Sequence, residues 1–249
     1  MKKPDLDCVA QTKNIMSRVK VKICGVRTLE EAQGAVDAGA DALGFNFWPR
    51  SARYIEPHAA HEVITGITPT VCTVGVFVNE EASRIVDIAS ELGLSAVQLH
   101  GDESPEFCER LASIETFRTI KAIRVGQDFD LSLIESYRVN MVLLDSSNEG
   151  SYGGTGRRFD WRIAIEGKHL APIILAGGLN IENVWDAITQ VRPAAIDVCS
   201  GVEAEPGRKD MDKLRGFMEV AARANALIAS ETDSGNRAST DTGSVEGGR

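Results

Sequence analysis

The chain alternates between short runs of apolar residues and longer segments in which apolar and polar residues recur with the period of a helix. Residues 19–24 alternate apolar and polar side chains, which predicts a strand, and Gly25 then allows the backbone to turn. Thr28 and Glu31 have the spacing of a capping box, so a helix is expected over residues 28–39. A strand followed directly by a capped helix is the unit that builds parallel sheets.

This unit recurs along the whole chain. Further strands are expected over residues 42–47, 71–78, 96–100, 118–124, 141–145, 172–176 and 194–199, with helical segments between them and a last helix over 210–226. Eight strand–helix units favour α/β architecture in the form of a single closed (β/α)8 TIM barrel. The alternative is an open doubly wound sheet, which often carries G-x-G-x-x-G after its first strand; the segment Cys24-Gly25-Val26-Arg27-Thr28 does not match that motif.

The same pattern sets the domain boundaries. Residues 1–18 are polar and show no periodicity, so they are expected to form an N-terminal extension. Residues 19–226 contain all eight units and are predicted to form one barrel domain. Residues 227–249 consist mainly of Ser, Thr, Gly, Asp and Arg, a composition that buries little apolar surface, and they are predicted to be a disordered C-terminal tail.

Composition and charge narrow the choice of partner and compartment. The length of 249 residues fits one barrel, and the net charge of -9 disfavours a nucleic-acid partner, because long contacts with phosphates need a basic face. No apolar run is long enough to span a membrane, and the N-terminus lacks the apolar core of a signal peptide. The five cysteines contain no C-x-x-C pair and no disulfide-like framework. These features predict a cytoplasmic protein without a membrane partner, either a monomer or a homodimer.

Glycine-rich turns after the last two strands indicate a phosphate site. Functional residues of such barrels lie on the loops that follow the strands. Gly177 and Gly178 follow the seventh expected strand, and Ser200 and Gly201 follow the eighth. Glycine lets the backbone approach a ligand, and backbone N–H groups there favour an anion. The loop after the sixth strand, with Gly153 and Gly154, is expected to close over the same ligand.

Three side chains flank that phosphate site in the expected order of strands. Asp145 ends the sixth strand, Cys24 ends the first, and Arg53 lies in the loop after the second. An acid, a phosphate grip, a thiol and a guanidinium along one rim suit a phosphorylated sugar that carries a second anionic group. Each residue also has an ordinary structural role, as a buried small hydrophobe, a turn cap or a solvated charge, and only their placement on one rim favours chemistry.

Asp197 stands apart, because it lies within an apolar run where an unpaired charge is costly. Lys22 lies on the strand that would neighbour it in a closed barrel, so a buried Lys22–Asp197 pair is our hypothesis, with its role, structural or catalytic, left open. His58 and His61 have a spacing that suggests metal ligands. They lie at a helix start without a third ligand, so a solvated face is favoured and no metal site is predicted.

Eight short motifs of the chain form a characteristic set, and these are Lys22-Ile23-Cys24-Gly25, Ala40-Asp41-Ala42-Leu43-Gly44-Phe45, Ser51-Ala52-Arg53-Tyr54-Ile55, Val74-Gly75-Val76-Phe77-Val78-Asn79, Val97-Gln98-Leu99-His100-Gly101, Gly153-Gly154-Thr155-Gly156, Ala176-Gly177-Gly178-Leu179-Asn180 and Ser200-Gly201-Val202-Glu203. In this order the motifs resemble the pattern of the phosphoribosylanthranilate isomerase family. They fall on nearly every expected strand end between residues 19 and 220. The resemblance implies isomerisation of N-(5-phosphoribosyl)anthranilate to 1-(2-carboxyphenylamino)-1-deoxyribulose 5-phosphate, an Amadori rearrangement of tryptophan biosynthesis that uses no cofactor.

The resemblance also implies a role for individual residues. The general base of the family falls on Cys24 and the general acid on Asp145, and an Asp that supports the site falls on Asp197. The Arg that holds the anthranilate carboxylate falls on Arg53. The backbone that binds the phosphate falls on Gly178 and Gly201 with their neighbours. One departure is Cys199, which stands where Ser is common and adds a second thiol near the barrel mouth.

Two other functions stay open at this point. One is that of a different phosphosugar barrel, such as the related isomerase of the histidine pathway, which places a carboxylate where Cys24 stands. The other is a non-catalytic barrel that binds a phosphorylated ligand as a sensor or scaffold. The first predicts turnover of the other substrate, and the second predicts binding without turnover.

Overall fold

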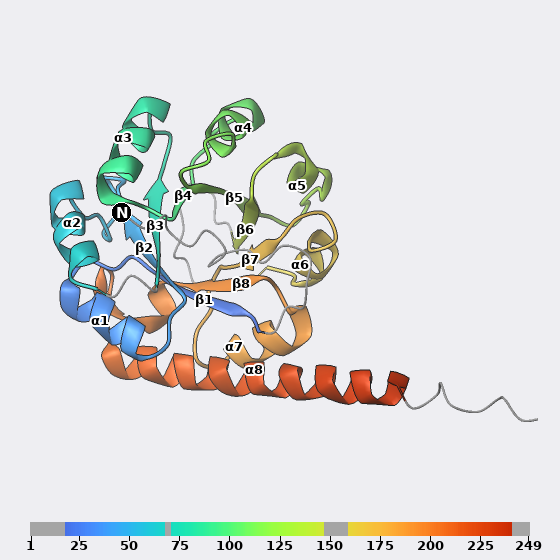
Figure 1. The fold of residues 1–249 in the computed structure, drawn as a ribbon. Helices are drawn as coiled ribbons and strands as arrows, with labels where there is room; N and C mark the ends of the chain where they lie inside the picture. The colour runs from blue at the N-terminus through green and yellow to red at the C-terminus, as the bar shows by residue number, and fades with distance from the viewer. Residues whose placement is uncertain (1–17, 68–70, 147–158, 241–249) are drawn as a thin grey trace, which may run out of the picture.

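Eight parallel strands close into a barrel, and the helices that follow them form an outer ring (Figure 1). This computed structural model describes residues 18–67, 71–146 and 159–240. The strands of the barrel, paired in chain order, are β1 (Lys20–Cys24), β2 (Ala42–Asn46), β3 (Cys72–Phe77), β4 (Ala96–Leu99), β5 (Arg118–Val125), β6 (Met141–Ser146), β7 (Ile173–Leu175) and β8 (Ala195–Val198). The predicted (β/α)8 fold is therefore confirmed.

The helices lie where the amphipathic segments are. They are α1 (Leu29–Asp37), α2 (Pro57–Thr65), α3 (Ala82–Leu92), α4 (Pro105–Ala112), α5 (Ser132–Ser136), α6 (Arg162–Gly167), α7 (Val184–Asp186), which continues as a π-helical turn (Ala187–Val191), and α8 (Met211–Thr240). The first helix begins as predicted, because the Thr28 side chain accepts a hydrogen bond from the Glu31 backbone N–H.

The apolar residues form two layers, as expected for a barrel. Side chains inside the barrel are mostly small or branched and come from alternate strand positions, among them Ala42, Val74, Ala96, Ile120 and Ile174. A larger layer fills the space between the strands and the helices. Parallel strands covered on both faces need continuous apolar runs, which explains why the strand segments are apolar on both sides.

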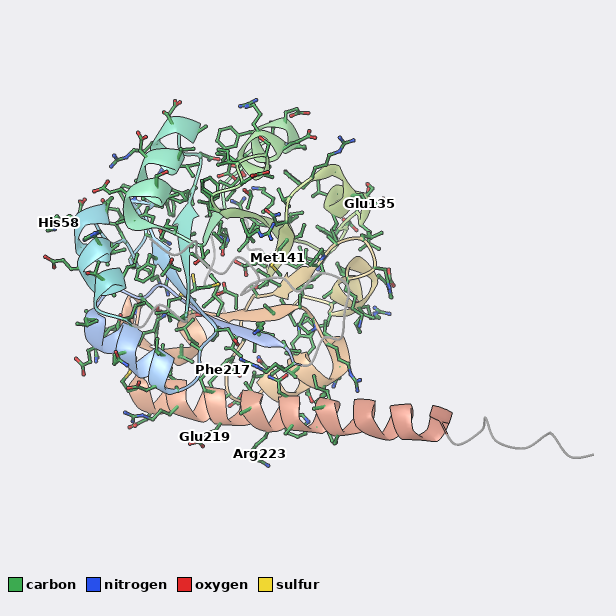
Figure 2. All side chains as sticks on the ribbon, in the orientation of Figure 1. His58, Glu135, Met141, Phe217, Glu219 and Arg223 are labelled. Carbon is green, nitrogen blue, oxygen red and sulfur yellow. The ribbon has the colours of Figure 1, made fainter. Side chains whose placement is uncertain are left out.

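Helix α8 shows how the outer layer is built (Figure 2). Phe217 is fully buried against the barrel, whereas Glu219 and Arg223 are exposed on the other side of the helix. The helix begins after Asp210, whose carboxylate accepts hydrogen bonds from two backbone N–H groups in its first turn. Such capping satisfies donors that have no partner within the helix itself.

The end of this helix differs from the sequence prediction. The composition predicts a disordered tail over residues 227–249, whereas in the structure residues 227–240 continue α8 as helix. Ile228 is only 7% exposed and extends the buried stripe that includes Ala221 and Ala224, and Glu231 pairs with Arg192. The apolar period thus runs past residue 226 before the polar composition begins. The remainder of the predicted tail and most of the predicted extension, residues 1–17, lie outside the described residues.

A small antiparallel ribbon lies between β8 and α8 and was not predicted. A 3-10 turn (Ser200–Val202) leads into β9 (Glu203–Glu205), which pairs with β10 (Arg208–Lys209). Strands of three and two residues are too short to show an alternating pattern in the sequence. The ribbon matters for the site, because it places Glu203 and Lys209 beside the end of β1 and β8.

The described cysteines correct one expectation. Cys24, Cys108 and Cys199 are free, but Cys72 is disulfide-bonded. The expectation that the cysteines form no disulfide is therefore not met. Spacing alone carried no signal for this bond, because disulfide partners are brought together by the fold. Among the described residues, no helix has the length and apolarity that a membrane span requires.

Candidate active site

An open pocket lies at the carboxyl ends of the strands. Its lining comes from seven strands or the loops after them and includes Cys24, Asn46, Trp48, Arg53, His100, Asp145, Gly177, Gly178, Asp197, Cys199 and Ser200. Most of the predicted site residues are thus brought together in one cavity. Gly201 directly follows Ser200 outside this lining, and Gly153 and Gly154 lie outside the described residues.

The hypothesised pair of Lys22 and Asp197 is present below the pocket. The two residues are direct neighbours in the register of β1 and β8, and Lys22 Nζ donates a hydrogen bond to Asp197 Oδ1 at 2.8 Å. Both side chains are buried, at 2% and 8% exposure. Burial lowers the pKa of Lys22, but the charges of Asp197 and Cys24 outweigh it and the pKa is raised. Burial raises the pKa of Asp197 to about 6, although Lys22 opposes the shift.

Cys24 ends β1 with its sulfur in a positively charged environment. Its interaction with the neighbouring Cys199 thiol lowers the pKa of Cys24 well below its ordinary value. Burial acts in the opposite direction, while the charges of Lys22 and Lys209 add to the lowering. The same contact with Cys24, together with burial, raises the pKa of the Cys199 thiol. The two shifts have opposite directions, so the thiolate form is favoured on Cys24.

Gly44 explains how this sulfur fits against the neighbouring strand. A Cβ atom built on Gly44 would lie 2.9 Å from Cys24 Sγ and 3.1 Å from Lys22 Nζ. Only a residue without a side chain leaves room for the thiol and the ammonium at this point of β2. The glycine in the expected strand over residues 42–47 is thus required by the contents of the site.

Asp145 ends β6 and is accompanied by a histidine that sequence reasoning did not single out. Asp145 is 6% exposed, and its Oδ2 lies 3.3 Å from Nε2 of His100, without the angle of a hydrogen bond. The other ring nitrogen of His100 lies 2.9 Å from the Gln98 side-chain amide. His100 follows β4 and lines the pocket, so its position at a strand end was the available signal.

Arg53 lines the pocket as predicted, but it also forms an ion pair that the sequence did not indicate. Its Nε and Nη2 donate to the two carboxylate oxygens of Glu203 at 3.1 and 2.7 Å. Lys209 Nζ donates to the same carboxylate at 3.1 Å and to the Cys199 carbonyl at 3.3 Å. Burial raises the pKa of Glu203, but Arg53 and Lys209 outweigh it, and the net pKa is lowered. Two cations and one carboxylate thus fix this edge of the pocket.

The predicted glycine turns have backbone conformations or contacts that require glycine. Gly177 and Gly178 have φ of 83° and 70°, and a Cβ on Gly177 would lie 2.4 Å from the Ser146 backbone nitrogen. A Cβ on Gly201 would lie 1.9 Å from the carbonyl oxygen of Leu179. The turns after β7 and β8 therefore pack directly against each other. Gly177 and Gly178 of the first turn and Ser200 of the second turn line the pocket together.

The metal alternative gains no support from the described residues. His58 and His61 are both exposed on α2, and Figure 2 shows His58 on the outside of the ring. Within the described residues, no group of three His, Cys, Asp or Glu side chains has the arrangement of a metal site. The two histidines are therefore a solvated helix face, as expected.

Comparison with known proteins gives one consistent result. The family model of N-(5'phosphoribosyl)anthranilate (PRA) isomerase matches residues 21–220. The N-(5'-phosphoribosyl)anthranilate isomerase of Geobacter sp. strain M21 is 48% identical over 204 residues, which cover 82% of this chain and 98% of that protein.

Solved structures agree with the sequence relatives. The phosphoribosyl anthranilate isomerase of Thermotoga maritima is similar with a TM-score of 0.76 and 45% identity, over 82% of this chain and 98% of that one. A second structure of this kind of enzyme, in complex with reduced 1-(O-carboxyphenylamino)-1-deoxyribulose 5-phosphate, has a TM-score of 0.73 and 44% identity, with the same coverage. The chain belongs to the N-(5'-phosphoribosyl)anthranilate isomerase family.

Proposed function

We propose that this chain isomerises N-(5'-phosphoribosyl)anthranilate to 1-(2-carboxyphenylamino)-1-deoxyribulose 5-phosphate by an acid/base Amadori rearrangement in tryptophan biosynthesis. Membership of the family supports the reaction, and the relative solved with a reduced form of the product supports the substrate class. The observation that carries the proposal is the placement of Cys24 on β1 and Asp145 on β6 in one pocket, with the glycine turns of β7 and β8 between them.

The two ends of the substrate are anionic, and the pocket offers a partner for each. The proposed phosphate site is the backbone of Gly177, Gly178, Ser200 and Gly201, where glycine allows close approach of N–H groups. Arg53 is proposed to hold the anthranilate carboxylate. Its guanidinium has five N–H donors, so it can bind a second carboxylate while it is paired with Glu203. Gly153 and Gly154 remain a prediction for the covering loop.

Two proton transfers complete the reaction between these anchors. Asp145 is proposed to donate a proton to the ring oxygen of the furanose, which opens the ring and leaves a protonated Schiff base. The iminium acidifies the hydrogen on C2′, and the Cys24 thiolate removes it from the other side. The enolamine that results relaxes to the ketone. These steps are redox-neutral proton shifts, so the proposal includes no cofactor.

Lys22 and Asp197 are proposed to support the base rather than to touch the sugar. Lys22 holds a positive charge beside the Cys24 sulfur, and Asp197 holds Lys22 in place from β8. Asp197 lines the pocket floor, so it also adds negative charge near the cationic intermediate. His100 is placed to orient the Asp145 carboxylate.

The cellular setting is a proposal of the same kind. An acidic chain with a small-molecule phosphorylated substrate is proposed to act in the cytoplasm, without nucleic-acid or membrane partners. Assembly as a monomer or a homodimer is left as a prediction, which light scattering of the purified protein decides.

The test is direct. Purified protein is mixed with freshly made N-(5'-phosphoribosyl)anthranilate, and loss of the substrate's fluorescence is followed. Turnover is expected with the wild type, and Cys24→Ser and Asp145→Asn are each expected to reduce it by about 10²-fold or more while substrate still binds. The aminoimidazole substrate of the histidine-pathway isomerase serves as the matched comparison. Binding without turnover, or turnover of that substrate alone, would replace the proposal by one of the two alternatives.

A further inference from the structure

The two thiols in the pocket lie on neighbouring strands at the same height. Ile23 pairs with Val198 in the register of β1 and β8, and one position further along both chains places Cys24 opposite Cys199. Neighbouring strands lie about 4.8 Å apart, within the range of about 4.4–6.8 Å that a disulfide spans between its Cα atoms. Paired positions of neighbouring strands place their side chains on the same face, and both cysteines line the same pocket.

Contacts on both sides keep the sulfurs in this position. A Cβ atom on Gly25 would lie 3.2 Å from Cys199 Sγ, and one on Gly44 would lie 2.9 Å from Cys24 Sγ. Cys199 Sγ accepts a hydrogen bond from Lys209 Nζ at 3.9 Å and donates one to Glu203 Oε1 at 3.7 Å. The two thiols are thus closely packed against the backbone of two glycines and a buried ammonium. This packing limits rotation of the two side chains away from each other.

A small oxidant can reach this pair. Both cysteines line the open pocket, Cys24 with 8% of its surface exposed and Cys199 partly buried. Cys108 is the internal contrast. It is fully buried in the layer between the barrel and the helices, and burial raises the pKa of its thiol to about 11. A peroxide reacts with thiolates that it can reach, so Cys24 and Cys108 differ in both respects.

We propose that Cys24 and Cys199 form a peroxide-reactive site that closes to a disulfide and reversibly stops turnover. The sulfur of Cys24 attacks one oxygen of a hydroperoxide, the O–O bond breaks, and the sulfur becomes a sulfenic acid as the other oxygen leaves as water or alcohol. The Cys199 sulfur then attacks the oxidised sulfur, the S–O bond breaks, and a second molecule of water leaves. Two thiols are oxidised and one peroxide is reduced.

The consequence for catalysis rests on the proposed function, in which Cys24 is the base. A disulfide removes the thiolate that takes the proton from C2′, and the Lys22 ammonium loses the anion beside it. Thiols restore the base by exchange. Cys199 stands where the resemblance leads us to expect Ser, which cannot form this bond, so the site is a feature of this chain's own sequence.

The test detects the Cys24–Cys199 disulfide directly. The full-length protein is treated with hydrogen peroxide, alkylated in acid and digested with trypsin. The expected product is the peptide of residues 23–27 linked to the peptide of residues 169–208, each of which contains one cysteine. The linked pair should be absent from Cys199→Ser and present in Cys108→Ala. This readout does not need the isomerase reaction, so it fails or succeeds separately from the proposed function.

Activity is measured on the same samples, each relative to its own thiol-reduced state. Wild type and Cys108→Ala are expected to lose about 10²-fold in turnover and to regain it with dithiothreitol. Cys199→Ser, which cannot protect its sulfenic acid as a disulfide, should become irreversibly oxidised at higher peroxide. Absence of the linked peptides from the wild type, or their presence with unchanged turnover, would overturn the proposal.

Discussion

Lys22 Nζ and Asp197 Oδ1 lie 2.8 Å apart inside the barrel, on directly paired residues of β1 and β8, with both side chains buried. The pair closes the barrel at the seam between its first and last strands. It also stands beneath the sulfur that is proposed to act as base, because Lys22 contributes to the low pKa of Cys24. The stability of the barrel and the proposed role of Cys24 as base therefore depend on the same buried Lys22 ammonium.

Asp197→Asn should lower both stability and turnover. The change leaves the Lys22 ammonium buried without its anion, which costs about 3–5 kcal/mol in the free energy of unfolding. Turnover should fall by about tenfold or more, because Lys22 is no longer held beside Cys24. Urea unfolding and steady-state kinetics measure the two effects.

Glu205→Gln, in an exposed pair with Arg208, is the control and should change stability by less than about 0.5 kcal/mol. Lower stability with unchanged turnover would leave Asp197 with a structural role alone.

Removal of the thiol donor on Cys199 should move the pH profile. The interaction with the Cys199 side chain is the largest cause of the low pKa of Cys24, so Cys199→Ala should raise that pKa. Because the base must be deprotonated, the acidic limb of kcat/KM then moves to higher pH. Cys199→Ser keeps a hydroxyl donor and should shift the limb less. Ultraviolet absorbance of the thiolate gives an independent titration. Superimposed profiles for wild type and Cys199→Ala would contradict this view of the pair.

The sequence predicted the parts of the site that lie on strand ends. Cys24 and Asp145 end strands whose apolar runs are unmistakable, and the rule that parallel barrels carry their chemistry there places them in one pocket. The Lys22–Asp197 pair followed from the same logic, since a closed barrel makes the first and last strands neighbours. The order of strands alone was enough to predict that these residues lie close together.

Other features depend on contacts that no local pattern records. Glu203 and Lys209 reach the pocket edge on a ribbon of very short strands, and Arg53, which pairs with Glu203, lies 150 residues away from it in the chain. The polar composition after residue 226 predicts disorder and hides the helix there, although Ile228 continues the buried stripe. Long-range ion pairs and the last turns of a helix are therefore learned from the structure.

Arg53→Lys should weaken substrate binding more than it slows chemistry. A lysine ammonium cannot reproduce the forked contact with Glu203 and offer further donors to the substrate carboxylate. Loss of a charged hydrogen bond of about 1.5–3 kcal/mol corresponds to a rise of about tenfold or more in KM. Arg50→Lys is the matched control in the same loop, where Arg50 is exposed and its guanidinium lies 5.8 Å from the ring of Trp48. An equal rise in KM for both variants would show that Arg53 makes no contact with the substrate carboxylate beyond what Arg50 makes.

The ion pairs of Glu203 should make stability fall in acid. The pKa of this carboxyl is lower in the folded protein than in the unfolded chain, because Arg53 and Lys209 outweigh burial. The folded state therefore gains stability from the ionised form above the unfolded pKa of about 4.3, and loses it as the pH falls through the lower folded value. Glu203→Gln should be less stable than wild type at neutral pH and should lose less on acidification. Urea unfolding across this range measures the difference, with Glu205→Gln as the control that keeps the acid sensitivity of the wild type.

Gly201→Ala should impair phosphate binding through the backbone alone. The added Cβ would lie 1.9 Å from the Leu179 carbonyl oxygen, so the turns after β7 and β8 must separate. Both turns are proposed to bind the phosphate, and KM should rise by about tenfold or more because the N–H groups no longer converge. Competitive inhibition by inorganic phosphate should weaken in parallel.

Gly93→Ala separates this effect from a general loss of stability. Gly93 also has a constrained conformation, with φ of 61° at the end of α3, but nothing lies within 4 Å of its added Cβ. The variant should lose about 1 kcal/mol of stability from left-handed strain and keep the KM of the wild type. If Gly201→Ala kept normal phosphate inhibition, the phosphate would have to bind elsewhere in the pocket. The sugar would then no longer lie between Cys24 and Asp145 as proposed.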